Sequence, residues 1–221
     1  AGVTLLEVGQ AGRVSPEQIE AAIHADTVAI LFVFGETIDR RGEVSLKDIV
    51  DIGKRRGVPI ILDASVANYP FDRLQEFAAL GIDLITTSGG KHIFGPPGTG
   101  FLFGRQDLMD VCRLMANPIH GIGRPLKIGK EEIVGLVTAL EIYVERDVEA
   151  EHRGWETSVR TMAEALADLP HATVTITAAD EVDRPVPRVR LAIDEQGLGT
   201  SAADIAEVLQ KAEPSVRVTR F

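Results

Sequence analysis

Short apolar runs alternate with amphipathic stretches over the first two thirds of the chain. The runs rich in Val, Ile, Leu and Phe are residues 3–8, 28–34, 58–62 and 82–86, with a shorter fifth at 101–103. Each run predicts a β-strand. Three of them (28–34, 58–62 and 82–86) are close to continuously apolar, which is typical of strands buried on both faces of a mostly parallel sheet.

Helical patterns separate these runs. Ser15 followed by Pro16 predicts a helix start, with serine as the N-cap and proline at the first helical position. A second helix has its apolar face at residues 46, 49 and 50 and ends near Gly53 or Gly57. A third covers residues 72–80. Strands alternating with helices predict an α/β fold with a mostly parallel sheet and flanking helices.

The pattern changes after residue 130. Apolar positions follow helical spacing from residue 133, and a helix-forming composition continues to about residue 169, which predicts one long connecting helix. Strands are expected around residues 174–176, 189–193 and 216–219, with a helix over 202–212. We therefore expect the C-terminal part of a large domain over residues 1–145. Residues 146–221 then form a connecting helix and a small α+β domain. Both ends lie in predicted strands, so a partial chain is expected.

Composition narrows the class of protein. The 221 residues are 45% hydrophobic and 25% charged, with a net charge of −10, values typical of a globular chain. The acidic balance argues against a broad nucleic-acid or membrane surface, and no apolar run approaches the ~20 residues of a membrane-spanning helix. The one cysteine, Cys112, cannot form an internal disulfide, which indicates a reducing compartment. A cytoplasmic location follows, with no membrane contact and no nucleic-acid partner expected.

Two glycine motifs suggest nucleotide binding but lack parts of the pattern. The stretch 95–100 reads Gly-Pro-Pro-Gly-Thr-Gly, and a P-loop needs Lys and then Ser or Thr to follow. Phe101 and Leu102 follow instead and begin an apolar strand, not a phosphate-binding helix. The stretch 121–123 follows no strand and lacks the third glycine of a dinucleotide site. Both nucleotide functions are excluded, and no cluster with metal-ligand spacing is found.

An aspartate and a lysine follow two successive buried strands. Asp63 comes directly after the strand at 58–62, and Lys91 follows the strand at 82–86 within Ser88-Gly89-Gly90-Lys91. A right-handed crossover with one helix brings both to the same carboxyl edge of the sheet, where open α/β sheets bind ligands. An Asp for a pyridinium nitrogen and a Lys for a Schiff base are the pair that pyridoxal phosphate (PLP) requires.

The residues around this pair resemble a known family. The runs 60–64, 83–91 and 95–104 are similar to the fold-type I PLP-dependent enzymes. Within them, the resemblance is to the branch of bacterial selenocysteine synthase and the D-glucosaminate-6-phosphate ammonia-lyases. It covers roughly residues 25–145, is weaker beyond, and includes the segment 123–133. The family's Gly-rich phosphate cup and ring-stacking side chain, expected upstream of Asp63, have no match here.

The resemblance implies roles for individual residues. Lys91 would hold PLP as a Schiff base and act as general base, Asp63 would keep the ring nitrogen protonated, and Ser88 would contact the cofactor phosphate. Arg124 and Lys127 would approach the active site of a neighbouring subunit. The alternatives, from the residues alone, are a solvated loop lysine, an aspartate capping a turn, and a serine bonded to loop backbone. For Asn68 and Tyr69, just after the aspartate, facing the pocket and turning the chain remain alternatives.

The function expected is a PLP-dependent lyase acting on an amino acid or amino sugar acid by α,β-elimination with release of ammonia. One alternative is a PLP-dependent transferase, either of the seryl-tRNA selenium transferase type or an aminotransferase. Another is a non-catalytic α/β binding protein of the same fold. The resemblance also implies a homo-oligomer, a homodimer or higher, with a small-molecule amino acid as substrate.

Overall fold

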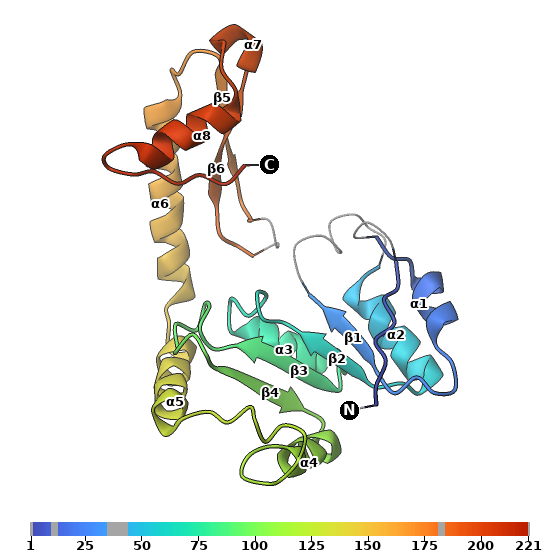
Figure 1. Ribbon diagram of the computed structural model, residues 1–221. Coiled ribbons are helices and arrows are strands. Elements are labelled where there is room, and N and C mark those ends of the chain that lie inside the picture. Colours follow the sequence, from blue (N-terminus) through green and yellow to red (C-terminus); the bar gives the residue numbers. More distant parts are fainter. Residues whose placement is uncertain (1, 10–12, 35–43, 181–183, 221) are drawn as a thin grey trace. The chain divides into compact units, whose positions relative to one another are not determined.

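The computed structural model describes residues 2–9, 13–34, 44–180 and 184–220. They form two compact units, Ala1–Arg146 and Asp147–Phe221, and each is described by itself (Figure 1). None of the helices in these described ranges is long and apolar enough to cross a membrane.

The first unit is built on a four-stranded sheet. Its strands, in spatial order, are β1 (Ile30–Val33), β2 (Ile60–Asp63), β3 (Leu84–Ser88) and β4 (Gly100–Gly104). The pairs β1–β2 and β2–β3 are parallel, and β4 is antiparallel to β3. Four of the predicted strands are thereby confirmed, as is the α/β class with a mostly parallel sheet.

Five helices belong to this unit: α1 (Pro16–Ala22), α2 (Leu46–Arg56), α3 (Asp72–Ala79), α4 (Gln106–Met115) and α5 (Lys130–Val144). The predicted start of α1 is confirmed, because Ser15 and Gln18 form a reciprocal capping box. Ser45 forms the same motif at α2. That helix ends at Gly57, whose φ of 66° is left-handed and suits glycine.

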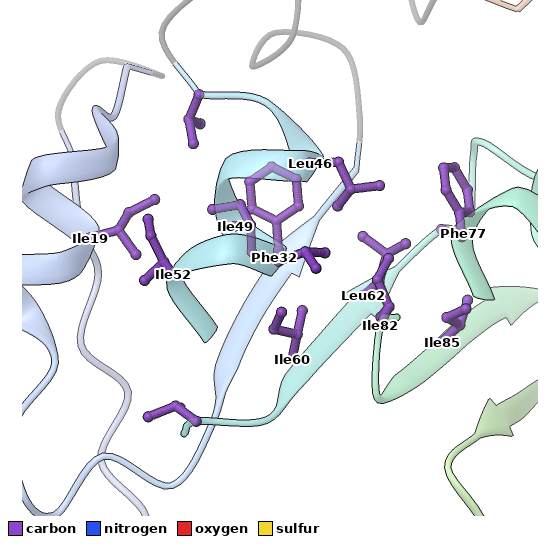
Figure 2. Close-up of a cluster of buried hydrophobic side chains, with 14 of the residues drawn as sticks. Ile19, Phe32, Leu46, Ile49, Ile52, Ile60, Leu62, Phe77, Ile82 and Ile85 are labelled. Carbon is purple, nitrogen blue, oxygen red and sulfur yellow. The ribbon is translucent and has the colours of Figure 1, made fainter. Parts of the chain in front are cut away.

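The core lies between one face of the sheet and the helices α1, α2 and α3 (Figure 2). Side chains from β1, β2 and β3 at matched positions (Phe32, Leu62 and Ile85) point into it, and Ile49 of α2 is fully buried. Gly53 allows α2 to approach closely, since a Cβ there would lie 2.7 Å from Cδ1 of Ile60. Burial of these apolar groups is the main source of stability.

The opposite face of the sheet is less covered. Leu31 and Val33 of β1 point to it and are 55% and 54% exposed. Parallel sheets are usually covered on both faces. Because Asp63 pairs with Val33 in register, the Asp63 side chain belongs to this second face.

The second unit combines helices with a pair of antiparallel strands. Its elements are α6 (Val148–Leu166), β5 (Ala172–Thr177), β6 (Arg188–Ile193), α7 (Glu195–Leu198) and α8 (Ala202–Lys211). β5 and β6 are antiparallel. Asp180 is 3% exposed and forms ion pairs with Arg184 and Arg188. Such pairing makes burial of a carboxylate tolerable.

Three sequence predictions about secondary structure are wrong. Residues 3–8 and 216–219 are not strands; Val3, Leu5 and Leu6 are exposed, and apolar alternation forms no strand without a neighbouring strand to pair its backbone. The predicted long helix is two helices. Asp147 starts the second one, because its carboxylate accepts a hydrogen bond from the Ala150 N–H at 2.8 Å and so caps α6.

Candidate functional site

Adjacent strands place Asp63 and Ser88 on one face at one edge of the sheet. Asp63, the last residue of β2, lies opposite Thr86 of β3, and Ser88 is two residues farther along that strand. Side chains two residues apart in a strand share a face. The structure therefore brings these two predicted residues together at the carboxyl edge, on the less covered face.

The Asp63 carboxylate is half-buried and only partly engaged. Its Oδ1 accepts a hydrogen bond from the Ser65 N–H at 2.9 Å, so one oxygen does cap the turn after β2. Within the described residues, Oδ2 accepts no hydrogen bond. One carboxylate oxygen thus remains available to a ligand at the strand end.

Lys91 lies in a tight turn after β3 and is exposed. The turn is held by the Gly89 N–H, which donates to Thr99 O at 2.9 Å, and by the Gly95 N–H, which donates to Gly89 O at 2.8 Å. In the described part of the chain the Lys91 ammonium forms no ion pair. Its amine is therefore accessible to a ligand.

The glycine-rich stretch 95–100 braces this turn. A Cβ at Gly90 would lie 2.5 Å from Cα of Pro97, and one at Gly100 would lie 2.8 Å from Thr87 O. Both contacts are with backbone, so the two segments pack against each other as only glycines allow. The stretch then enters β4, which confirms that it is not a P-loop.

The structure decides between the two alternatives for Asn68 that the sequence left open, because its side chain is buried beneath the sheet edge. The Asn68 side chain is fully buried, and its Nδ2 donates to Thr87 Oγ1 at 2.9 Å and to Ser88 O at 3.1 Å. Tyr143 of α5 donates its hydroxyl proton to Asn68 O at 2.6 Å. Neither Thr87 nor Tyr143 was expected at the site. For Tyr143 the only sequence signal is a hydroxyl between two apolar neighbours, and Thr87 lies between two other hydroxyl residues and has no distinguishing signal.

Arg146 follows α5 and reaches the turn of Lys91. Its Nη1 donates to His92 O at 3.1 Å. Its guanidinium carbon lies 5.3, 5.4 and 5.8 Å from the ring centres of Tyr143, Phe94 and Tyr69, a cation–π arrangement. The end of α5 therefore contacts both loops that flank the sheet edge.

The remaining predicted residues lie elsewhere. Arg124 is half-buried and Lys127 exposed, both in the segment between α4 and α5. A separate hollow of about 500 Å³ is lined by residues of α5 with Phe71 and Phe101, and none of the predicted site residues lines it.

A family model, described as L-seryl-tRNA selenium transferase (SelA), matches residues 1–166. The chain belongs to this family. SelA proteins and the relatives below are PLP-dependent enzymes.

Curated relatives have different chemistries. The chain is 34% identical over 224 residues to a 5'-C-glycyluridine monooxygenase-decarboxylase of Streptomyces sp, covering 100% of the chain and 53% of that protein. It is 30% identical to the D-glucosaminate-6-phosphate ammonia lyase of Salmonella typhimurium, covering 100% and 56%. It is 25% identical to the L-seryl-tRNA(Sec) selenium transferase of Aquifex aeolicus, covering 98% and 52%. The chain spans about half the length of the curated relatives it matches.

Solved structures agree on the fold. A D-glucosaminate-6-phosphate ammonia-lyase structure superposes with a TM-score of 0.73 at 29% identity, covering 100% of this chain and 56% of that one. The cysteine desulfurase CsdA of Escherichia coli, at 17% identity and a TM-score of 0.54, shares the fold alone; 95% of this chain and 53% of that chain are covered. The resemblance to the fold-type I PLP enzymes is confirmed.

The donor set at the sheet edge fits PLP. The cofactor needs a carboxylate for its ring nitrogen and an amine for its aldehyde. Oδ2 of Asp63 and the exposed Lys91 amine could supply these, because Asp63 ends β2 and Lys91 follows the neighbouring strand β3. Ser88, which is half-buried, comes after Asp63 and before Lys91 in the sequence.

Proposed function

We propose that this SelA-family chain carries the PLP-anchoring half of an enzyme that eliminates a β-substituent from a hydroxylated amino acid or amino sugar acid. The observation that carries the proposal is the pairing of Asp63 with Thr86, because this register puts the carboxylate and the Ser88–Lys91 turn at one edge. The relation to the ammonia lyase, over 100% of the chain in both sequence and structure, supports the lyase chemistry.

When bound, PLP supplies an electron sink for chemistry at the carbon that bears the substrate amine. Lys91 would hold the cofactor through its amine and would serve as the base at that carbon. Asp63 would keep the ring nitrogen protonated through Oδ2, which accepts no hydrogen bond within the described residues. The Ser88 hydroxyl would bind the phosphate.

A second candidate comes from the Streptomyces relative. This relative is 34% identical over the whole chain, and its name indicates decarboxylation together with oxygenation. The same Asp63 and Lys91 would serve both reactions, since each needs the ring as an electron sink. Product analysis separates the two: ammonia is released in the elimination, and carbon dioxide in the decarboxylation.

We also propose a cytoplasmic homo-oligomer with a small-molecule amino acid substrate. Support comes from α5, a helix with apolar side chains on several sides. Ile133, Val134 and Ile142 are 50%, 64% and 62% exposed. A helix that is apolar all round is normally buried, so a second copy on this surface would cover it.

The test is spectroscopic, on the complete protein that contains this chain. We expect purified wild type with PLP to show a visible Schiff-base band that borohydride traps covalently. Lys91→Ala abolishes trapping, and Lys47→Ala, which removes an exposed lysine of α2, leaves it unchanged. Absence of trapping in wild type, or trapping that survives Lys91→Ala, would overturn the proposal. Ammonia release from a panel of phosphorylated and unphosphorylated amino sugar acids then tests the reaction.

A further inference from the structure

Hydrogen bonds link the loop after β2 to the last residues of β3. The Ala64 N–H, next to Asp63, donates to Thr86 O at 2.8 Å. The Thr87 hydroxyl donates to Ala64 O at 3.3 Å, and Asn68 donates to that hydroxyl and to Ser88 O. The residue that follows Asp63 and the residues that precede the Lys91 turn are thus bonded to each other.

The orientation of the Asn68 amide is fixed by Ser88. A carbonyl oxygen only accepts hydrogen bonds, so the Asn68 nitrogen must face Ser88 O. Its Oδ1 is consequently left buried without a hydrogen-bond partner in the described residues. An unpartnered buried oxygen reduces stability, and the two hydrogen bonds that Nδ2 donates offset this cost.

The end of α5 also forms hydrogen bonds with the loop after β2 and with the loop after β3. Tyr143 donates to the backbone of Asn68 in the first loop, and Arg146 donates to His92 O in the second. Tyr143 and Arg146 also lie against each other, with the guanidinium carbon 5.3 Å from the ring centre. One helix end thus bonds both to the loop that follows Asp63 and to the loop that carries Lys91.

We propose that Asn68, Thr87, Tyr143 and Arg146 form a clamp that sets the position of Lys91 relative to Asp63, with Asn68 as the central positioning residue. The inference rests on the proposed function, because it concerns how these two residues meet PLP. Reactive groups must be held within a fraction of an ångström of their productive geometry. None of the four residues needs to touch PLP for this role.

The decisive variant is the double substitution Asn68→Leu with Thr87→Val in the complete protein. The double variant removes both side-chain partners of the Asn68–Thr87 bond together with the unpartnered Oδ1. It also leaves Ser88 O without its Asn68 donor, which lowers stability, whereas Ala64 O keeps the Ala67 N–H at 3.0 Å. We expect a melting temperature below wild type, PLP affinity weakened about tenfold, and a weaker visible circular dichroism band per bound PLP. That band reports how rigidly the ring is held.

Tyr143→Phe is the second variant, and it removes one hydroxyl. It is expected to weaken PLP binding several-fold, in the same direction as the double variant. The control is Asp83→Asn at the opposite edge of the sheet. There Asp83 accepts from the Ile60 N–H at 2.8 Å and pairs with Arg105, and its side chain is 17% exposed. This control lowers the melting temperature and leaves PLP affinity and the dichroism band unchanged.

The outcomes are distinct. Unchanged PLP affinity and dichroism in Tyr143→Phe and in the double variant overturn the clamp while the proposed function stands. An equal loss in Asp83→Asn also overturns it, since the effect would then follow general stability. If wild type traps no PLP with borohydride, the proposed function fails and the clamp with it.

Discussion

Substitution of Gly90 by alanine tests the packing that supports the Lys91 turn. The new Cβ would lie 2.5 Å from Cα of Pro97 and 3.2 Å from the C and N atoms of the same residue. The shortest of these is about 1 Å below a normal carbon–carbon contact. All three atoms are backbone, so no rotamer change relieves the overlap. The two segments must separate.

Separation would strain the bonds that hold the turn, from the Gly89 N–H to Thr99 O and from the Gly95 N–H to Gly89 O. Overpacking of this kind costs about 1–3 kcal/mol. For a protein of this size, each kcal/mol lowers the melting temperature by roughly 2–4 °C. We expect Gly90→Ala to melt about 2–12 °C lower than wild type and to trap less PLP with borohydride.

Gly98 provides the matched control in the same motif. A Cβ there has no heavy atom within 4 Å, and its φ is not left-handed. Gly98→Ala should leave stability unchanged or raise it by up to about 1 kcal/mol, because alanine has fewer unfolded conformations. Thermal unfolding of both variants decides the matter. A wild-type melting temperature for Gly90→Ala, or an equal loss in both, would refute the packing argument.

Three further predictions concern other parts of the first unit. Ser45→Ala removes the cap of α2 and should cost about 1 kcal/mol at pH 7 in urea unfolding. Hydrogen bonds from the backbone N–H of residue 45 and from the Ser45 hydroxyl lower the pKa of Asp48, and the variant loses the contribution of the hydroxyl. This contribution is present above the unfolded pKa near 4 and is lost as pH falls through the lower folded pKa, so the difference between wild type and variant should shrink there. A constant difference would contradict this. Ile49→Ala, at a fully buried position, should cost about 2–5 kcal/mol in the same assay; less than 1 kcal/mol would mean that the core is misplaced. Val134→Glu on exposed α5 should shift the protein to a smaller species in light scattering, and an unchanged mass would exclude this surface as the contact.

The sheet and the candidate site at its carboxyl edge could be predicted from the sequence because both depend on local pattern. The strands at 28–34, 58–62 and 82–86 are apolar runs with one helix between each pair. Right-handed crossovers then require Asp63 and the Lys91 turn to share an edge. The pairing of Asp63 with Thr86, known only from the structure, shows in addition that Asp63 and Ser88 lie on the same face of the sheet.

Features that depend on distant partners were not predictable. An apolar stretch at 3–8 looks like a strand, but strands form only where another strand pairs with their backbone. The bonds of Asn68 reach residues 19, 20 and 75 positions away. No local pattern encodes such separations. The break between α5 and α6 was readable in principle, since Asp147 is a good N-cap residue.

The incompletely covered sheet face has a practical consequence for handling the isolated chain. In the sheet formed by the described residues β1 is an edge strand, and its Leu31 and Val33 are more than half exposed. An edge with free backbone groups beside apolar side chains is a template for adding strands of other molecules. The 221-residue chain produced alone should therefore aggregate as its concentration rises. A lysine at position 31 should raise its solubility.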